Sequence, residues 1–103
     1  MKYLISKKAG ADLENIWLYT LKKWSIAQAD RYFKLIINEI KHLAQHPESG
    51  EDYSHIRKGY YRSRVKSHFI FYKINPEKER IEIIRILHQR IRANASFYIF
   101  ENV

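Results

Sequence analysis

The chain has 103 residues, of which 46% are hydrophobic and 15% aromatic, and its formal net charge at pH 7 is +8. This length and hydrophobic content predict one domain with a packed core rather than intrinsic disorder, and the absence of cysteine excludes disulfides and cysteine-based zinc sites. The positive charge favours an acidic partner, either nucleic acid, an acidic protein or a protein that holds nucleic acid, although many small basic domains carry such a charge for solubility alone.

The first residues predict a short strand followed by a helix. Tyr3-Leu4-Ile5 is apolar, and Ser6 directly after it is a suitable helix N-cap. Between Ala9 and Trp24 the apolar residues recur at the spacing of an amphipathic helix. Lys7-Lys8 interrupts the opening apolar residues too early for a signal peptide, and no apolar run approaches the ~18 residues of a membrane span. We therefore expect a cytoplasmic protein without a membrane segment.

A second amphipathic helix is predicted directly after the first. Ser25 and Gln28 have the spacing of a capping box, in which the hydroxyl and the amide each satisfy a free backbone N–H. Apolar residues continue on one side of the helix from Ala29 to Ala44, and Pro47 ends it before a turn at residues 48–51. The short connection at Ser25 predicts an antiparallel helical hairpin whose joined apolar stripes cover a sheet.

Three further strands are predicted after a polar segment at residues 52–55. The first covers residues 56–66 and carries five cations, while residues 68–74 and 80–88 form an antiparallel hairpin around a turn. Strict alternation in the last strand places Ile81, Ile83, Arg85 and Leu87 on one face and Glu82, Ile84, Ile86 and His88 on the other. Because both faces are largely apolar, we expect this strand to lie inside the sheet.

These elements predict an α+β fold in the order β-α-α-β-β-β, with an antiparallel sheet and the helical hairpin packed on one face. We expect residues 1–103 to form one domain, with a core at residues 1–89 and a variable C-terminal tail at residues 90–103. The tail carries an aromatic cluster at residues 97–100, which either packs back on the sheet or is a docking surface.

Seven short motifs make the chain similar to a known family. They are Tyr3-Leu4-Ile5-Ser6; Ala9 with Asp12-Leu13, Ile16-Trp17 and Tyr19; Trp24-Ser25 with Gln28-Ala29 and Tyr32; His46-Pro47 with Gly50; Ile56-Arg57 with Gly59-Tyr60; Ser67-His68 with Ile70-Phe71-Tyr72; and Arg85-Ile86-Leu87-His88-Gln89. In this order they resemble the ParE branch of the RelE/ParE toxin superfamily of type II toxin–antitoxin systems, which stabilise plasmids and chromosomes. The likeness runs from about Tyr3 to Gln89.

The resemblance implies a toxin that inhibits DNA gyrase, traps it with cleaved DNA and stops replication, without being an enzyme itself. It also implies a ParD-like antitoxin, which forms a hetero-oligomer with the toxin and wraps it with a C-terminal segment. No cofactor is implied. Similar family members continue after the Leu-His-Gln segment with a basic or small residue and Met-Asp, whereas this chain has Arg90-Ile91-Arg92. A cation thus replaces the acid, which bears on the contacts with the target and on toxicity.

The helical hairpin carries more aromatic residues than two short helices can cover. The candidates for antitoxin contact are Trp17, Tyr19, Trp24 and Tyr32. Trp17 and Trp24 lie on the core stripe and are expected in the core, whereas Tyr19 lies off it and is the better candidate. An apolar groove beside the helices would suit an acidic amphipathic partner helix.

Cations of the strand at residues 56–66 and of the tail are candidates for contact with the target. They are Arg57, Lys58, Arg64, Lys66, Arg90 and Arg92. Tyr60 and Tyr61 lie between these cations, where they would stack on or hydrogen-bond to DNA or an acidic protein surface. The alternative is a face that is simply solvated, and direct binding of nucleic acid is not required.

Two other functions remain open at this point. Relatives in the RelE branch cut messenger RNA on the ribosome, and such a catalytic set would here consist of Arg57, Arg85 and His88. The structural alternatives are an ion pair of Arg85 with Glu82, Asp12 or Glu14, and packed, hydrogen-bonded rings for His88 and His68. The second function is that of a non-toxic survivor that mainly binds an antitoxin. The five histidines have no metal-site spacing.

Overall fold

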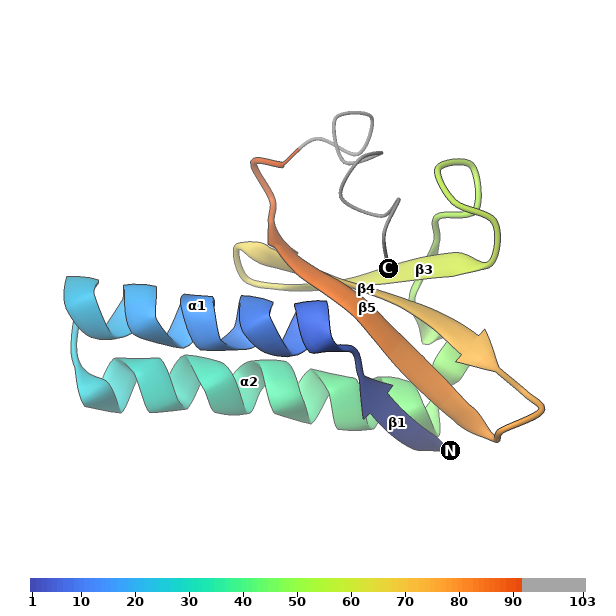
Figure 1. Cartoon of the computed structure of the whole chain (residues 1–103), viewed down its shortest axis with the longest axis horizontal. Coiled ribbons are helices and arrows are strands. Elements are labelled where there is room, and N and C mark those ends of the chain that lie inside the picture. Colours follow the sequence, from blue (N-terminus) through green and yellow to red (C-terminus); the bar gives the residue numbers. More distant parts are fainter. Residues whose placement is uncertain (92–103) are drawn as a thin grey trace.

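The computed structural model describes residues 1–91, in which a pair of helices covers one face of a five-stranded sheet (Figure 1). The elements are β1 (Lys2–Ile5), α1 (Lys7–Lys23), α2 (Ile26–Gln45), the 3-10 helix η1 (Pro47–Ser49), β2 (Glu51–Asp52), β3 (Tyr60–Val65), β4 (His68–Asn75) and β5 (Arg80–His88). The strand order is β1-β5-β4-β3-β2, and every pairing is antiparallel except that of β1 with β5. The predicted α+β class, the helical hairpin and the inner position of β5 are confirmed.

Both helices begin at the predicted serine caps. The Ser6 hydroxyl accepts a hydrogen bond from the Ala9 N–H at 3.0 Å, and the Ser25 hydroxyl accepts one from the Gln28 N–H at 3.1 Å. The second half of the predicted capping box is replaced, because the Gln28 side chain accepts a hydrogen bond from Arg31 at 3.3 Å. The second helix ends at Gln45, with His46 as its C-cap before Pro47, as predicted.

The predicted strand at residues 56–66 is wrong in its first part. Residues 53–59 form a loop instead, closed by a hydrogen bond of 2.8 Å from the Tyr53 N–H to the Tyr60 carbonyl. Glu51 and Asp52, which were expected in a turn and a polar segment, form the extra strand β2. Glu51 lies opposite Arg62 in the register, and their side chains form an ion pair of 2.8 Å. Ile56 belongs to this loop and packs on the sheet, whereas Tyr60 is the first residue of β3.

A β-bulge in β5 also contradicts the strict alternation that we expected for this strand. Phe71 pairs with Arg85 and Tyr72 with Ile83, so Ile84 has no partner across the ladder with β4. The core beneath the helices therefore contains Ile81, Ile83 and Ile86, whereas Ile84 and Leu87 belong to a separate cluster. One extra residue moves the second half of the strand to the opposite faces.

The second apolar cluster lies on the face of the sheet that the helices do not cover. Its buried members are Tyr53, Tyr60, Phe71, Ile84 and Leu87. Tyr60 is only 7% exposed, so the expectation that it faces a partner is wrong. Tyr61 points to the helical side, where it stacks on Tyr72 with ring centroids 5.6 Å apart. Tyr53 and Ile56 of the loop at residues 53–59 thus contribute to a core.

A groove between the helical hairpin and the sheet

A groove of about 1030 Å³ separates the helical hairpin from one end of the sheet. Its helical wall includes Ile16, Tyr19, Trp24, Arg31, Tyr32 and Leu35. Its sheet wall includes Lys66 and His68 from the start of the β4 hairpin and Ile86, His88, Arg90 and Ile91 from the end of β5. Aromatic and aliphatic side chains therefore face a wall that carries cations and imidazoles.

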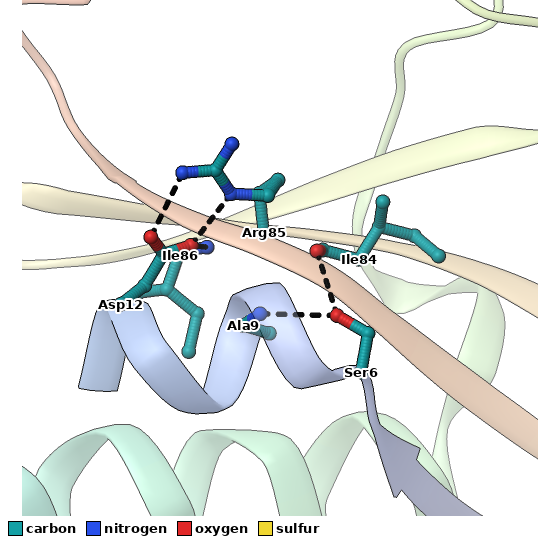
Figure 2. Close-up of polar contacts among 6 residues, drawn as sticks. All are labelled: Ser6, Ala9, Asp12, Ile84, Arg85 and Ile86. Atoms are coloured by element: carbon teal, nitrogen blue, oxygen red, sulfur yellow. Dashed lines mark hydrogen bonds and ion pairs between the residues drawn. The ribbon is translucent and has the colours of Figure 1, made fainter. Parts of the chain in front are cut away.

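Asp12 of α1 lines this groove and binds β5 through hydrogen bonds. Figure 2 shows its carboxylate accepting hydrogen bonds from Arg85 Nε at 2.8 Å, from Arg85 Nη2 at 2.9 Å and from the Ile86 N–H at 2.9 Å. These hydrogen bonds raise the pKa of Arg85 above its ordinary value. Beside them the Ser6 hydroxyl donates to the Ile84 carbonyl at 2.9 Å. The start of α1 thus holds the bulge of β5, and the predicted ion pair of Arg85 is confirmed with Asp12 as its partner.

Two histidines lie side by side on the sheet wall. His68 and His88 are opposite each other in the register, and their rings meet edge-on with centroids 5.2 Å apart. Tyr32 Oη lies 2.6 Å from His68 Nδ1 and donates to the Val65 carbonyl at 3.1 Å. The Arg90 N–H donates to His88 Nδ1 at 3.1 Å. The prediction of packed, hydrogen-bonded histidines is confirmed.

His68 is neutral at pH 7 in this environment. Burial, and to a smaller extent the nearby His88, lower its pKa from the ordinary 6.5 to about 4, while the carboxylate of Asp12 acts in the opposite direction. A neutral imidazole at this position has one nitrogen that still takes up a proton.

Three of the four predicted antitoxin contacts line the groove. Tyr19, Trp24 and Tyr32 line the groove, and the exposed fractions of Tyr19 and Trp24 are 62% and 74%. The expectation that Trp24 lies in the core is wrong, because it is the C-cap of α1 with φ −130° and ψ −91° and no longer follows the helical stripe. Trp17 was also expected in the core, but it is half-buried, belongs to neither apolar cluster and donates from Nε1 to Asp30 at 3.0 Å, which joins α1 to α2.

The predicted target contacts fall into two separate groups. Arg64, Lys66 and Arg90 lie near the β3–β4 turn, where Arg64 donates to the Lys66 carbonyl at 2.7 Å and to the Gln89 side chain at 2.6 Å. Arg57 and Lys58 lie in the loop before β3, beyond the strand end that pairs with Lys73. Arg92 and the aromatic cluster at residues 97–100 lie outside the described residues.

The three residues of the alternative catalytic set do not converge. Arg57 precedes β3, whereas His88 is level with Val65 at the other end of that strand. The five residue steps from Tyr60 to Val65, at ~3.3 Å each, separate the two ends of β3 by ~16 Å. The Arg85 guanidinium is engaged by Asp12. The set of Arg57, Arg85 and His88 is therefore not assembled at one place, because Arg57 lies at the other end of β3 and Arg85 is paired with Asp12.

Sequence reasoning missed a stripe of α2 in the helical wall. Arg31 and Leu35 line the groove together with Gln28 and Tyr32. These four positions have the spacing i, i+3, i+4 and i+7, so they form a stripe of α2 beside the core stripe. This second stripe is visible in the sequence once the core stripe has been set aside.

Residues 1–91 contain neither a membrane-spanning helix nor a cluster of metal ligands. Among residues 1–91, neither helix is long and apolar enough to cross a membrane. Within the same residues, histidine and acidic side chains do not form a group of three that would hold a metal ion.

Comparisons with known proteins agree with this fold. The profile of a family described as the ParE toxin of the type II toxin-antitoxin system parDE matches residues 3–93. The chain is 39% identical over 93 residues to Toxin ParE1 of Caulobacter vibrioides, and this covers 90% of the chain and 94% of that protein. It is 37% identical over 90 residues to Toxin ParE1 of Mycobacterium tuberculosis, covering 87% and 91%. A solved structure titled "Chromosomal ParDE TA system from P. aeruginosa" has a TM-score of 0.74 at 20% identity, covering 85% of this chain and 95% of the other.

Proposed function

This chain belongs to the ParE toxin family of type II toxin–antitoxin systems, and we propose that it is a non-enzymatic, cytoplasmic inhibitor of DNA gyrase that a ParD-like antitoxin inactivates. The observation that carries this proposal is the groove beside the helical hairpin, with exposed apolar side chains on one wall and cations on the other. The gyrase target follows from the resemblance of the motifs to the ParE branch.

The groove suits an acidic amphipathic helix of the antitoxin. Tyr19, Trp24, Leu35 and Ile91 offer it large side chains that are between 39% and 74% exposed. The cations of the lining are Arg31, Lys66, Arg85 and Arg90. Asp12 is the acidic residue of the lining, and its ion pair with Arg85 compensates its charge. The groove is therefore cationic, and acidic residues on the partner complement it.

The same end of the sheet supplies the proposed contacts with gyrase. Arg64, Lys66 and Arg90 lie there, and Lys66 and Arg90 also line the groove. An antitoxin helix in the groove would cover these two cations, so it would neutralise the toxin by occlusion. Arg57 and Lys58 lie at the far end of β3 and form a second, independent candidate surface.

Purified gyrase and relaxed plasmid DNA test the toxin activity. We expect the chain in stoichiometric excess to prevent supercoiling and to accumulate cleaved DNA. The double variant Lys66→Ala/Arg90→Ala should lose most of this inhibition. Lys34→Ala/Lys41→Ala is the matched control, because it removes two exposed cations of α2 that do not line the groove. Unchanged supercoiling with the wild-type chain would contradict the proposal.

Two further measurements separate the alternatives. Codon-positioned cleavage of messenger RNA in a translating extract, abolished by Arg57→Ala, Arg85→Ala or His88→Ala, would favour a RelE-like ribonuclease. Growth arrest after induction without antitoxin would eliminate the non-toxic survivor.

Measurements of antitoxin affinity test the proposal that the antitoxin binds in the groove. Trp24→Ala and Tyr19→Ala should weaken antitoxin binding at least tenfold, whereas Leu18→Ala, an exposed apolar residue of α1 outside the groove, should not.

A further inference from the structure

We infer that His68 and His88 form a subsite in the groove for a carboxylate of the antitoxin, and that occupation of this subsite takes up one proton. The inference rests on the proposed antitoxin role of the groove and identifies its polar anchor. It follows from the hydrogen bonds that already engage one nitrogen of each ring.

The contacts of His88 orient a hydrogen-bond donor. Its Nδ1 accepts the Arg90 N–H, so in the neutral ring the proton is on Nε2. Among residues 1–91 this Nε2–H has no hydrogen-bond acceptor, and His88 lines the groove. It is therefore set to donate to an acceptor that enters from outside.

The contacts of His68 leave a nitrogen that is ready to be protonated. Tyr32 Oη donates to the Val65 carbonyl, so its lone pairs remain to accept from His68 Nδ1 at 2.6 Å. This assigns the proton of the neutral ring to Nδ1 and leaves Nε2 as the basic atom. A carboxylate beside Nε2 would favour the imidazolium, since an opposite charge nearby stabilises the charged form.

The charges around the pair favour an anion over a cation. The ionisable groups that line the groove with the pair are Asp12 and Tyr19 from α1, Arg31 and Tyr32 from α2, Lys66 from the β3–β4 turn, and Arg85 and Arg90 from the end of the sheet. Asp12 is paired with Arg85, so the remaining charges are positive. A metal ion on His88 Nε2 would require the proton on Nδ1, where the Arg90 N–H donates instead. The pair therefore suits a carboxylate and not a metal.

The affinity for the antitoxin as a function of pH tests the subsite. The probe is the antitoxin encoded by the reading frame next to the gene of this chain, measured by fluorescence anisotropy between pH 5 and pH 8. If the pKa of His68 rises from about 4 in the free chain to its ordinary value of ~6.5 in the complex, binding is about 30-fold tighter at pH 5 than at pH 8.

Two asparagine variants test the two rings separately, and a third is the control. His68→Asn keeps an amide near Tyr32 but removes Nε2, so the dependence on pH should flatten. His88→Asn keeps an acceptor for the Arg90 N–H but removes the Nε2 donor, so affinity should fall about tenfold across the range. His42→Asn is the control, because His42 is exposed on α2 and does not line the groove.

The outcomes separate this inference from the proposed function. Tight binding that Trp24→Ala weakens but that is independent of pH would overturn the carboxylate subsite and leave the antitoxin groove intact. Failure of the antitoxin to bind at any pH would overturn both. If inorganic phosphate or a single-stranded oligonucleotide binds with the same pH dependence and displaces the antitoxin, the anion is a phosphate and the carboxylate assignment fails. Imidazole nitrogen NMR of the free chain should show the Nε2–H tautomer of His88, and an Nδ1–H tautomer would contradict the inference.

Discussion

Replacing Asp12 by alanine removes three hydrogen bonds that join α1 to the bulge of β5. The carboxylate accepts from Arg85 Nε, from Arg85 Nη2 and from the Ile86 N–H, at 2.8, 2.9 and 2.9 Å. The exposed fractions of the Asp12 and Arg85 side chains are 13% and 18%, so the pair is largely withdrawn from water. The variant would take this carboxylate away from the Arg85 guanidinium and from the Ile86 N–H.

The size of the effect follows from this burial. Breaking a fully buried ion pair at one partner costs about 3–5 kcal/mol, and the slight exposure of this pair places the expected loss near ~3 kcal/mol. At about 4–8 °C per kcal/mol for a domain of this size, Tm should fall by ~12–24 °C. Small domains unfold with about 5–15 kcal/mol, so the variant should still fold at room temperature.

Urea unfolding followed by far-UV circular dichroism measures this loss. Glu51→Ala is the matched control, because it breaks the Arg62–Glu51 pair of the same 2.8 Å length whose Glu51 side chain is 57% exposed. Exposed pairs contribute about 1 kcal/mol at most, so the control should lose less than a third as much. Asp12→Ala/Arg85→Met should be less destabilised than the sum of its single variants, since the charge left behind is gone. Equal losses for Asp12→Ala and Glu51→Ala, or strict additivity, would refute the reasoning.

Three further predictions concern the core, the pH dependence of stability and the hairpin. Tyr72→Phe should lower the unfolding free energy by about 2 kcal/mol in urea, because the Gly50 N–H and the Pro47 carbonyl lose their partner. Gly50→Ala should also destabilise, since its Cβ would overlap the Tyr72 hydroxyl, whereas Gly10→Ala in open space of α1 should stabilise by about 0.5–1 kcal/mol; a stabilised Gly50→Ala would contradict this packing. The pKa of His68 is about 4 in the folded chain and ~6.5 when unfolded, so the unfolded state binds more protons and stability should fall as pH drops from about 6.5 to about 4. His68→Asn should flatten this dependence of the unfolding free energy on pH, as measured by urea titrations at several pH values, whereas the control His42→Asn should not. An unchanged pH dependence in His68→Asn would assign the effect to another group. Trp17→Phe should leave antitoxin affinity within about twofold of wild type in the anisotropy assay, because Trp17 contacts Asp30 and does not line the groove. A loss of affinity as large as that of Trp24→Ala would show that the antitoxin also binds outside the groove.

The helices were predictable from sequence because their signals are local. The Ser6 and Ser25 caps bond to N–H groups three residues on, and the apolar stripes repeat within one or two turns. The pairing of β2 with β3 depends instead on a loop that buries Tyr53 against Phe71 across the sheet. Such a contact between distant residues leaves no periodic signal in either segment.

The candidate site was predictable to the same partial extent. Tyr19 and Tyr32 were recognised as candidates because they are aromatic and lie on known helices. Trp24 was assigned to the core because its spacing continues the stripe of α1, but the backbone leaves the helical conformation at that residue. Asp12 and Arg85 are 73 positions apart, so sequence spacing offered Asp12 as one of three partners and only the fold selects it.

The bulge of β5 connects the stability of the fold to the composition of the groove. Strict alternation would place Arg85 and Leu87 on the helical face, but the extra residue at Ile84 brings Ile86 and His88 to that face instead. His88 therefore lies beside His68 only because the bulge is present, and Ser6 and Asp12 hold the bulge from α1. Asp12→Ala should accordingly weaken antitoxin binding under conditions where the variant is fully folded, although the partner need not touch Asp12. A folded Asp12→Ala variant with wild-type affinity and wild-type pH dependence would show that the histidine pair does not depend on the bulge.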